Sequence, residues 1–201
     1  MRKIILTLIS FIIFSNFYAQ EKLEIKRIGF SIDIPQKWIF TSNEEVLKNL
    51  DNYNFTDKQL ETLLKSTNAS IGLATLVKYD PKTYPGIIPT IKIRTQEVKT
   101  KNIQEFASQL KQSGEDLKKT LNDFKYIDTP SVVEISGKKV VKFSVQFRLK
   151  QENNSFNICS RSYYILKNGY YISLNFIEEI GKEDNSLLFE DLIKTISLTD
   201  K

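Results

Sequence analysis

The sequence predicts an α+β fold, an α/β/α sandwich around a largely antiparallel sheet of about six or seven strands. Consecutive hairpins are predicted in the second half of the chain, and they pair antiparallel because they need no crossover helix. Amphipathic helices are predicted near the beginning, the middle and the end of the chain, where they can pack on the sheet. The 5 prolines and most of the 7 glycines lie between the periodic segments, which favours one domain without linkers.

The first 19 residues have the order of a secretory signal peptide. Arg2 and Lys3 precede an uncharged apolar run from Ile4 to Phe14, and the chain then turns polar up to Ala19. This run is shorter than the roughly 20 residues that cross a bilayer. We therefore expect cleavage near Ala19–Gln20. The expected product is a single soluble domain, residues 20–201, that is periplasmic or secreted and has no transmembrane segment.

The first half of the mature chain predicts three strands. Residues 23–34 are expected as one strand that stops at Pro35, with Trp38 in the loop that follows. Ser70 to Tyr79 and Thr90 to Val98 are the next two. Three prolines and a glycine between them predict a restricted loop over residues 80–89.

Capping residues predict where the helices begin. Ser42 and Thr56 are expected to cap two short helices, and Asn102 to cap the longest one. Apolar residues continue along one stripe of that helix as far as Leu121. Gly114 lies on the same stripe, where it either allows close approach to a sheet or ends the helix.

Two hairpins and a final helix follow. Strands at 132–136 and 139–150 flank a predicted Gly137-Lys138 turn, and strands at 155–166 and 170–177 flank Asn168-Gly169. A helix over residues 186–194 and a short strand over 196–198 close the chain. Tyr163, Tyr164, Tyr170 and Tyr171 lie near the second turn, where they form either a recognition rim or cross-strand packing pairs.

Composition excludes several chemistries. The chain has no histidine, so a Ser-His-Asp or Cys-His site cannot form within it. Because Cys159 is the one cysteine, no structural zinc site and no internal disulfide are expected, and its place in an apolar strand favours burial. No cofactor or metal is predicted. The formal charge of +5 is mild and does not indicate nucleic-acid binding.

Candidate catalytic residues are few. Ser136 and Lys139 have the spacing of a Ser-Lys pair, but they fall at a predicted hairpin turn, which explains them. Adjacent acidic residues such as Glu178-Glu179 point apart and are expected as solvated surface. Carboxylates distant in the sequence remain able to form a glycosidase pair.

One group of basic residues is a candidate binding surface. The polar sides of the predicted strands carry Lys92, Arg94, Lys142, Arg148, Lys150 and Arg161. On neighbouring strands with that side open to solvent, they would form a basic face for anionic polymers or lipid headgroups. The alternatives are long side chains on a wet sheet face, or charges that pair with Glu and Asp beneath a helix.

The segment from Gly29 to Trp38, GFSIDIPQKW, resembles the opening of PsbP-like or Mog1-like domains, in which an apolar strand runs into a proline and then a tryptophan. The closing order is similar too: an aromatic strand, an acidic loop, a helix and Thr195-Ile196-Ser197-Leu198. The resemblance implies an α/β/α sandwich around an antiparallel sheet and a binding or assembly role. It carries no site residues over to this chain.

Three functions stay open on the sequence. The leading hypothesis is an exported, non-enzymatic binding or accessory domain of the cell envelope, with an envelope or periplasmic protein as partner. The second is a histidine-free hydrolase of polysaccharide or peptidoglycan that uses two carboxylates. The third is a binding protein for an anionic small molecule or lipid.

Overall fold

The computed structural model describes residues 21–41, 70–151 and 154–199. The predicted signal peptide and the two helices predicted after Ser42 and Thr56 lie outside these residues. No helix within the described ranges is long and apolar enough to cross a membrane.

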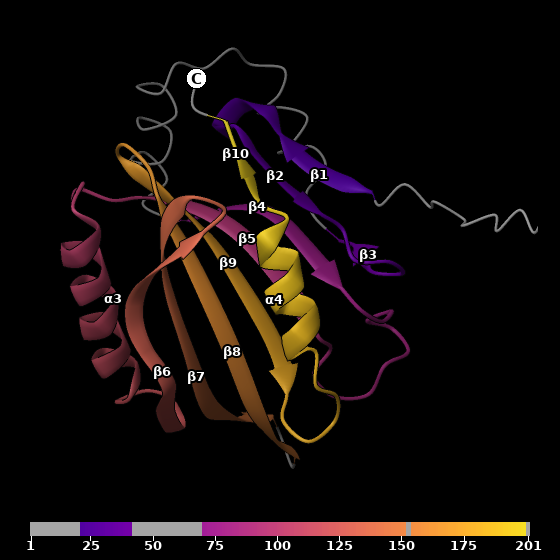
Figure 1. Cartoon of the computed structure of the whole chain (residues 1–201). Helices are drawn as coiled ribbons and strands as arrows, with labels where there is room; N and C mark the ends of the chain where they lie inside the picture. The colour runs from indigo at the N-terminus through magenta and orange to yellow at the C-terminus, as the bar shows by residue number, and fades with distance from the viewer. Residues whose placement is uncertain (1–20, 42–69, 152–153, 200–201) are drawn as a thin grey trace, which may run out of the picture.

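A seven-stranded sheet forms the centre of the fold (Figure 1). Its strand order is β3-β4-β5-β9-β8-β7-β6, and every neighbouring pair is antiparallel. The strands are β3 (Ile39–Phe40), β4 (Ile71–Val77), β5 (Thr90–Glu97), β6 (Asn122–Ile135), β7 (Lys138–Gln151), β8 (Asn154–Leu166) and β9 (Tyr170–Glu179). The predicted α+β class and the antiparallel sheet are confirmed.

A second, three-stranded sheet was not predicted. It consists of β1 (Lys22–Ile25), β2 (Phe30–Asp33) and β10 (Ser197–Leu198), with β2 in the middle. The prediction of one strand over residues 23–34 is wrong, because a 3-10 turn over Lys26–Ile28 reverses the chain. Gly29 makes this reversal possible: its φ of 59° lies in the left-handed region, and a Cβ there would lie 2.1 Å from the carbonyl oxygen of Thr199.

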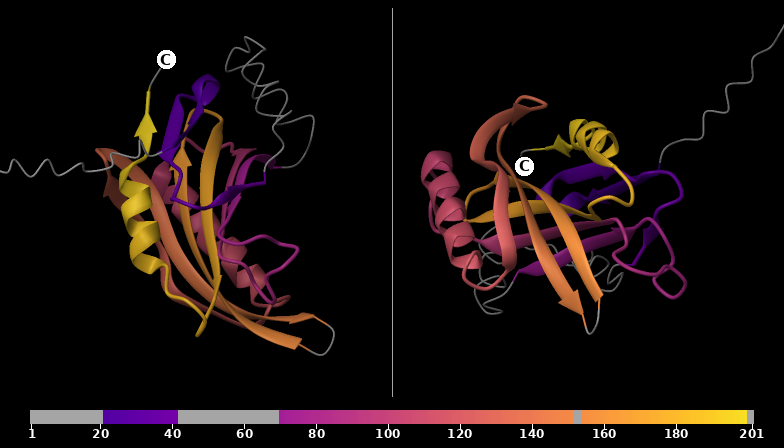
Figure 2. Two further views of the ribbon diagram at one scale, coloured as in Figure 1. Left: turned by 90° about the vertical axis from the view of Figure 1, so that its right-hand side faces the viewer. Right: turned by 90° about the horizontal axis from the view of Figure 1, so that it is seen from below.

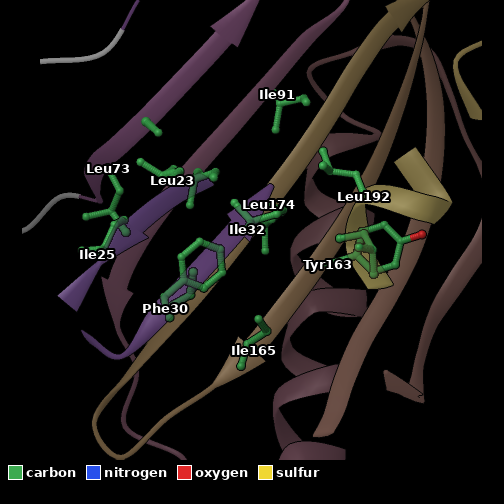
Figure 3. Packing of buried hydrophobic residues seen from close by; sticks show 14 of the residues in the cluster. Leu23, Ile25, Phe30, Ile32, Leu73, Ile91, Tyr163, Ile165, Leu174 and Leu192 are labelled. Carbon is green, nitrogen blue, oxygen red and sulfur yellow. The ribbon is translucent and has the colours of Figure 1, made fainter. Parts of the chain in front are cut away.

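Helices and the small sheet cover the two faces of the main sheet (Figure 2). Helix α4 (Ser186–Lys194) and the β1-β2-β10 sheet lie on one face, and helix α3 (Ile103–Leu117) lies on the other, mainly over β6 and β7. The larger core fills the α4 face, where Phe30 and Ile32 of β2 lie close to Leu174 of β9 (Figure 3). The predicted sandwich is therefore present.

Trp38 contributes to the same core. Its ring meets Phe189 of α4 edge-on, with centroids 6.2 Å apart. Phe189 in turn packs on Phe176 of β9, at 4.6 Å between centroids. The Pro-x-x-Trp segment therefore has a structural role, as a cover at the edge of the core.

Helix α3 begins as predicted. The Asn102 side chain accepts hydrogen bonds from the backbone N–H groups of Gln104 and Glu105, at 2.9 and 3.1 Å. Gly114 does not end the helix. It is buried, and a Cβ there would lie 1.6 Å from the hydroxyl oxygen of Tyr126, so it allows β6 to approach. The expected continuation to Leu121 is wrong, because the helix ends at Leu117.

The two predicted hairpins are present, one of them with a shifted turn. Asn168-Gly169 joins β8 to β9 as predicted. The first turn is Ser136-Gly137 rather than Gly137-Lys138, because Ile135 pairs with Lys138. Both turn residues have positive φ, 49° and 73°, as a two-residue hairpin of this hand requires.

Strand β6 is longer than the predicted 132–136. It pairs only with β7 and carries three register shifts, so it is a bulged edge strand. Pro130 lies within it, a residue that edge strands tolerate. The bulges and the proline interrupt the alternation of apolar and polar residues by which a strand is predicted, so the sequence indicates only the last part of β6.

Candidate functional site

The six basic residues predicted as one surface lie on two faces of the main sheet. Lys142 lies opposite Tyr163, and the register continues through Leu174 to Ile93. Directly opposite residues share a face, while successive residues of one strand do not. Lys92, the neighbour of Ile93, therefore points to the other face from Lys142.

Arg94 shares the face of Lys92, on the α3 side. Arg148 and Lys150 follow Lys142 at even spacing in β7, and Arg161 lies opposite Ser144 of the same strand. Four of the six are thus on the α4 side and two on the α3 side. The structure does not bring them together, and a binding role for them stays a prediction.

Two of these side chains have acidic partners and a third lies against a ring. Arg148 forms an exposed ion pair with Asp123, with 2.9 Å between nitrogen and oxygen. Lys142 lies 5.7 Å from the ring centre of Tyr163. Arg161 donates to Glu178, whose side chain is only 4% exposed. Arg161 therefore has a structural partner inside the fold.

Glu178 is the centre of a polar network at the end of β9. One carboxylate oxygen accepts from Arg161, and the other accepts from both the backbone N–H and the side-chain amide of Asn185, each at 3.0 Å. The burial of Arg161 acts to lower its pKa, but the hydrogen bond to Glu178 and the nearby negative charges together more than offset this, and the pKa is raised. Because Asn185 precedes α4, the network fixes the start of that helix.

The network continues to the loop after β4. Lys78 donates to Asn185 at 2.8 Å and to Glu183, and the Tyr79 hydroxyl also donates to Glu183. The hydrogen bonds from Lys78 and then Tyr79 lower the pKa of Glu183. We call these six residues, Lys78, Tyr79, Arg161, Glu178, Glu183 and Asn185, the ion-pair end of the sheet.

The opposite end of the sheet carries a cavity of about 520 Å³. Four lysines line it: Lys101, Lys138, Lys139 and Lys167. Asn168 and four apolar side chains, Ile103, Ile165, Leu166 and Leu198, complete the lining. We call it the lysine pocket. None of the described residues that line it is acidic.

These four lysines were not identified in the sequence analysis, although the sequence contains the information needed. They lie outside the alternating parts of the strands, at a helix start and beside two hairpin turns. The alternation within the predicted strands indicated Lys92 and Lys142 instead, because both lie on the polar sides of strands. The useful signal was that alternate turns of an antiparallel meander lie at the same end of the sheet.

A smaller cavity of about 360 Å³ lies between β6 and α4. Its lining includes two exposed carboxylates, Glu134 and Glu190, beside Lys142, Lys194 and Tyr163. Within the described ranges, no group of three or more Cys, Asp or Glu side chains is placed to hold a metal ion.

Four tyrosines near the Asn168-Gly169 turn pack into the protein. Tyr163 and Tyr170 are buried in the α4-side core. Tyr164 and Tyr171 surround Phe106 of α3, with ring centres 6.0 and 5.2 Å from it. Burial raises the pKa of both hydroxyls. Cross-strand and helix packing therefore explains these four residues.

The layers and strand order define a PsbP-like α+β sandwich. The solution structure of cyanobacterial PsbP (CyanoP) from Synechocystis sp. PCC 6803 aligns with a TM-score of 0.51 at 11% sequence identity, over 89% of this chain and 92% of that one. This likeness shows the fold and confirms the PsbP-like resemblance. The Mog1-like part of the resemblance stays a prediction.

A second solved structure is LpqN, involved in cell envelope biogenesis of Mycobacterium tuberculosis. It aligns with a TM-score of 0.48 at 11% identity, over 92% of this chain and 88% of that one. This weaker likeness supports no argument about the present chain. No protein-family model matches the sequence, and no curated protein matches it significantly.

Proposed function

We propose that this chain is an exported, non-enzymatic binding or accessory domain of the cell envelope, with an envelope or periplasmic protein as its partner. Export follows from the predicted signal peptide. The PsbP-like fold is compatible with an accessory role, the use to which the resemblance points. Arg148 and Lys150 are exposed on the α4 side of β7 and are proposed contact positions for a partner.

The observation that carries the proposal is how the described structure uses its buried polar groups. Glu178 and Asn185 are bonded within the ion-pair end, and Ser162 donates to Asn175 at 2.8 Å. Thr95 donates to the carbonyl of Tyr171 at 2.9 Å. A catalytic site needs a buried or shielded group that is free to react with a substrate. These groups are bonded within the sandwich and stabilise it, so they are not free to react with a substrate.

The test is affinity capture from an envelope fraction with the purified protein as bait, followed by a direct binding measurement with each captured protein. We expect one partner to bind the purified chain in isolation, and Arg148→Ser with Lys150→Ser to weaken it. Lys82→Ser with Lys182→Ser removes the same charge at two other exposed positions and is the matched control. Failure to obtain any directly binding partner from several extraction conditions would count against the proposal.

The carboxylate hydrolase remains the second candidate, because Glu134 and Glu190 line the same cavity. A glycosidase needs one carboxylic acid and one carboxylate on either side of the scissile bond. Incubation of the protein with peptidoglycan and with soluble polysaccharides distinguishes the two functions. Turnover that Glu134→Gln or Glu190→Gln abolishes would replace the binding proposal with this one.

A further inference from the structure

The topology collects lysines at one end of the main sheet. Strands β6 to β9 form an antiparallel meander, so the β6–β7 and β8–β9 turns lie at the same end, toward the top of Figure 1. Glu97 pairs with Tyr170, so β5 also ends there and leads into α3. Lys101, Lys138-Lys139 and Lys167 are far apart in the sequence and meet because of this connectivity.

The positive potential of the pocket has a second source. Helix α3 starts at Ile103, which lines the pocket, and the N-terminal end of a helix carries partial positive charge. Asn102 already accepts from two N–H groups of the first turn, so the helix contributes mainly through its dipole. The exposed ammonium groups of Lys101 and Lys139, together with the helix dipole, favour an anionic ligand.

Lysine also indicates the type of anion. An ammonium group is a compact point charge that binds phosphate oxygens from many directions, whereas the planar fork of arginine binds carboxylate and phosphate alike. No arginine is among the described residues that line the pocket. A phosphate monoester carries up to two negative charges, so it is better matched by more than one lysine than a carboxylate with a single charge is.

The rest of the lining is apolar. Ile103, Ile165, Leu166 and Leu198 come from α3, β8 and β10, so three separate elements supply it. A cavity of about 520 Å³ is in the size range of small-ligand sites. It has room for a phosphate and several carbon atoms, and burial of each methylene contributes favourably.

We propose that the lysine pocket binds an organic phosphate that carries an apolar group. Lys101 and Lys139 hold the phosphate, and the apolar group lies against the isoleucine and leucine side chains. Such a ligand is either a dissolved phosphate ester or the headgroup region of an anionic lipid. This inference goes beyond the proposed function, because it holds for the isolated chain whether or not a protein partner exists.

Calorimetric titration of the purified protein tests the proposal. The probes are octyl phosphate below its aggregation limit, glycerol phosphate, which lacks the apolar chain, and octyl glucoside, which lacks the charge. We expect octyl phosphate to bind most tightly, with an affinity that falls as salt is added. Vesicles of phosphatidylglycerol in phosphatidylcholine, against phosphatidylcholine alone, test the lipid source.

The variant that tests the site is Lys101→Ser with Lys139→Ser, since both side chains are exposed and neither is needed for packing. It should weaken octyl phosphate binding about tenfold or more. Lys82→Ser with Lys182→Ser removes the same charge outside the pocket and should leave the affinity unchanged. Circular dichroism checks the fold, and the single variant Lys139→Ser replaces the double one if that fails to fold.

Each possible outcome of these titrations either supports the proposal or overturns it. Octyl phosphate binding that only the pocket variant weakens supports the proposal, and vesicle binding lost in the same variant identifies the lipid source. Binding of octyl phosphate without vesicle binding identifies the dissolved source. No binding of octyl phosphate, equal binding of octyl glucoside, or equal weakening in the control variant overturns it. Failure to capture a protein partner would overturn only the proposed function, because the binding of octyl phosphate or of vesicles does not depend on a protein partner.

Discussion

The two ends of the main sheet differ in how their charged side chains are arranged. At the ion-pair end, Arg161, Glu178 and Asn185 satisfy one another within the fold, and Lys78 and Glu183 extend the same network. At the other end, Lys101 and Lys139 are exposed at the mouth of a cavity whose described lining residues include no acidic side chain. The first arrangement stabilises the protein, whereas the second leaves exposed ammonium groups for the proposed anionic ligand.

The largest predicted effect belongs to the ion-pair end. Glu178→Ala leaves Arg161 partly buried without its counter-ion and leaves the N–H groups of Asn185 without an acceptor. We expect the free energy of unfolding to fall by about 3 kcal/mol, measured by urea denaturation. Lys101→Ser with Lys139→Ser should change it by less than about 0.5 kcal/mol. Equal effects at the two ends would refute the distinction between them.

The next prediction concerns how α3, which brings Lys101 to the pocket, is held to the sheet. Gly114→Ala places a Cβ against the Tyr126 hydroxyl and forces helix and strand apart. We expect a loss of about 1–3 kcal/mol in the free energy of unfolding. Gly72→Ala is the matched control, because a Cβ there meets nothing within 4 Å, and it should be neutral within about 0.5 kcal/mol.

If both glycine variants have the same stability, the close approach at Gly114 does not hold α3 in place. The lysine pocket would then depend on the aromatic contacts of Phe106 with Tyr164 and Tyr171. Titration of Gly114→Ala with octyl phosphate shows whether the close approach at Gly114 or the aromatic contacts of Phe106 are needed to position Lys101.

Much of the fold could be predicted because its signals are local. Alternation in β7, the Asn168-Gly169 turn and the Asn102 cap each need only a few neighbouring residues, and all three predictions are confirmed. The strand predicted over residues 23–34 failed because its alternation continues on both sides of the reversal at Gly29. Only the contact with Thr199, at the other end of the chain, shows why a glycine is needed there.

The candidate site was harder to predict because it depends on topology. Strand alternation correctly shows which side of β5 or β7 carries a lysine, but it does not show which faces coincide across β9 and β8. The sequence therefore predicts one surface for Lys92 and Lys142, but the register places them on opposite faces of the sheet. Nor does the sequence show that Arg161 pairs with Glu178, since that contact links two strands through a particular register.

A smaller effect is expected from acid pH. The pKa of Glu183 is lowered by the hydrogen bond from Lys78, so the stabilisation it provides is present above the ordinary glutamate pKa of about 4.3 and is lost as pH falls through the lowered value. Glu183→Gln should cost at most about 1 kcal/mol at neutral pH, because the pair is partly exposed. The difference from the parent protein should disappear in acid.

Urea denaturation at a series of pH values measures this effect. Lys101→Ser with Lys139→Ser should show the acid dependence of the parent protein, because it leaves Glu183 and its partners unchanged. A constant difference between Glu183→Gln and the parent across the acid range would mean that the ion pair does not contribute through its charge.

The smallest effect is a change in reactivity at Cys159, which lies opposite Glu178 in the β8–β9 pair. The predicted burial of this thiol is confirmed at 4% exposure, and burial raises its pKa, so little of the reactive thiolate is present. Alkylation by iodoacetamide should be slow, while a Ser155→Cys variant offers an exposed thiol that reacts quickly. Because Glu178→Ala loosens the ion-pair end, it should speed the reaction of Cys159, and Lys101→Ser with Lys139→Ser should not. An unchanged rate in Glu178→Ala would mean that the ion-pair end stays closed without its central carboxylate, and that the packing of β8 and β9 alone shields the thiol.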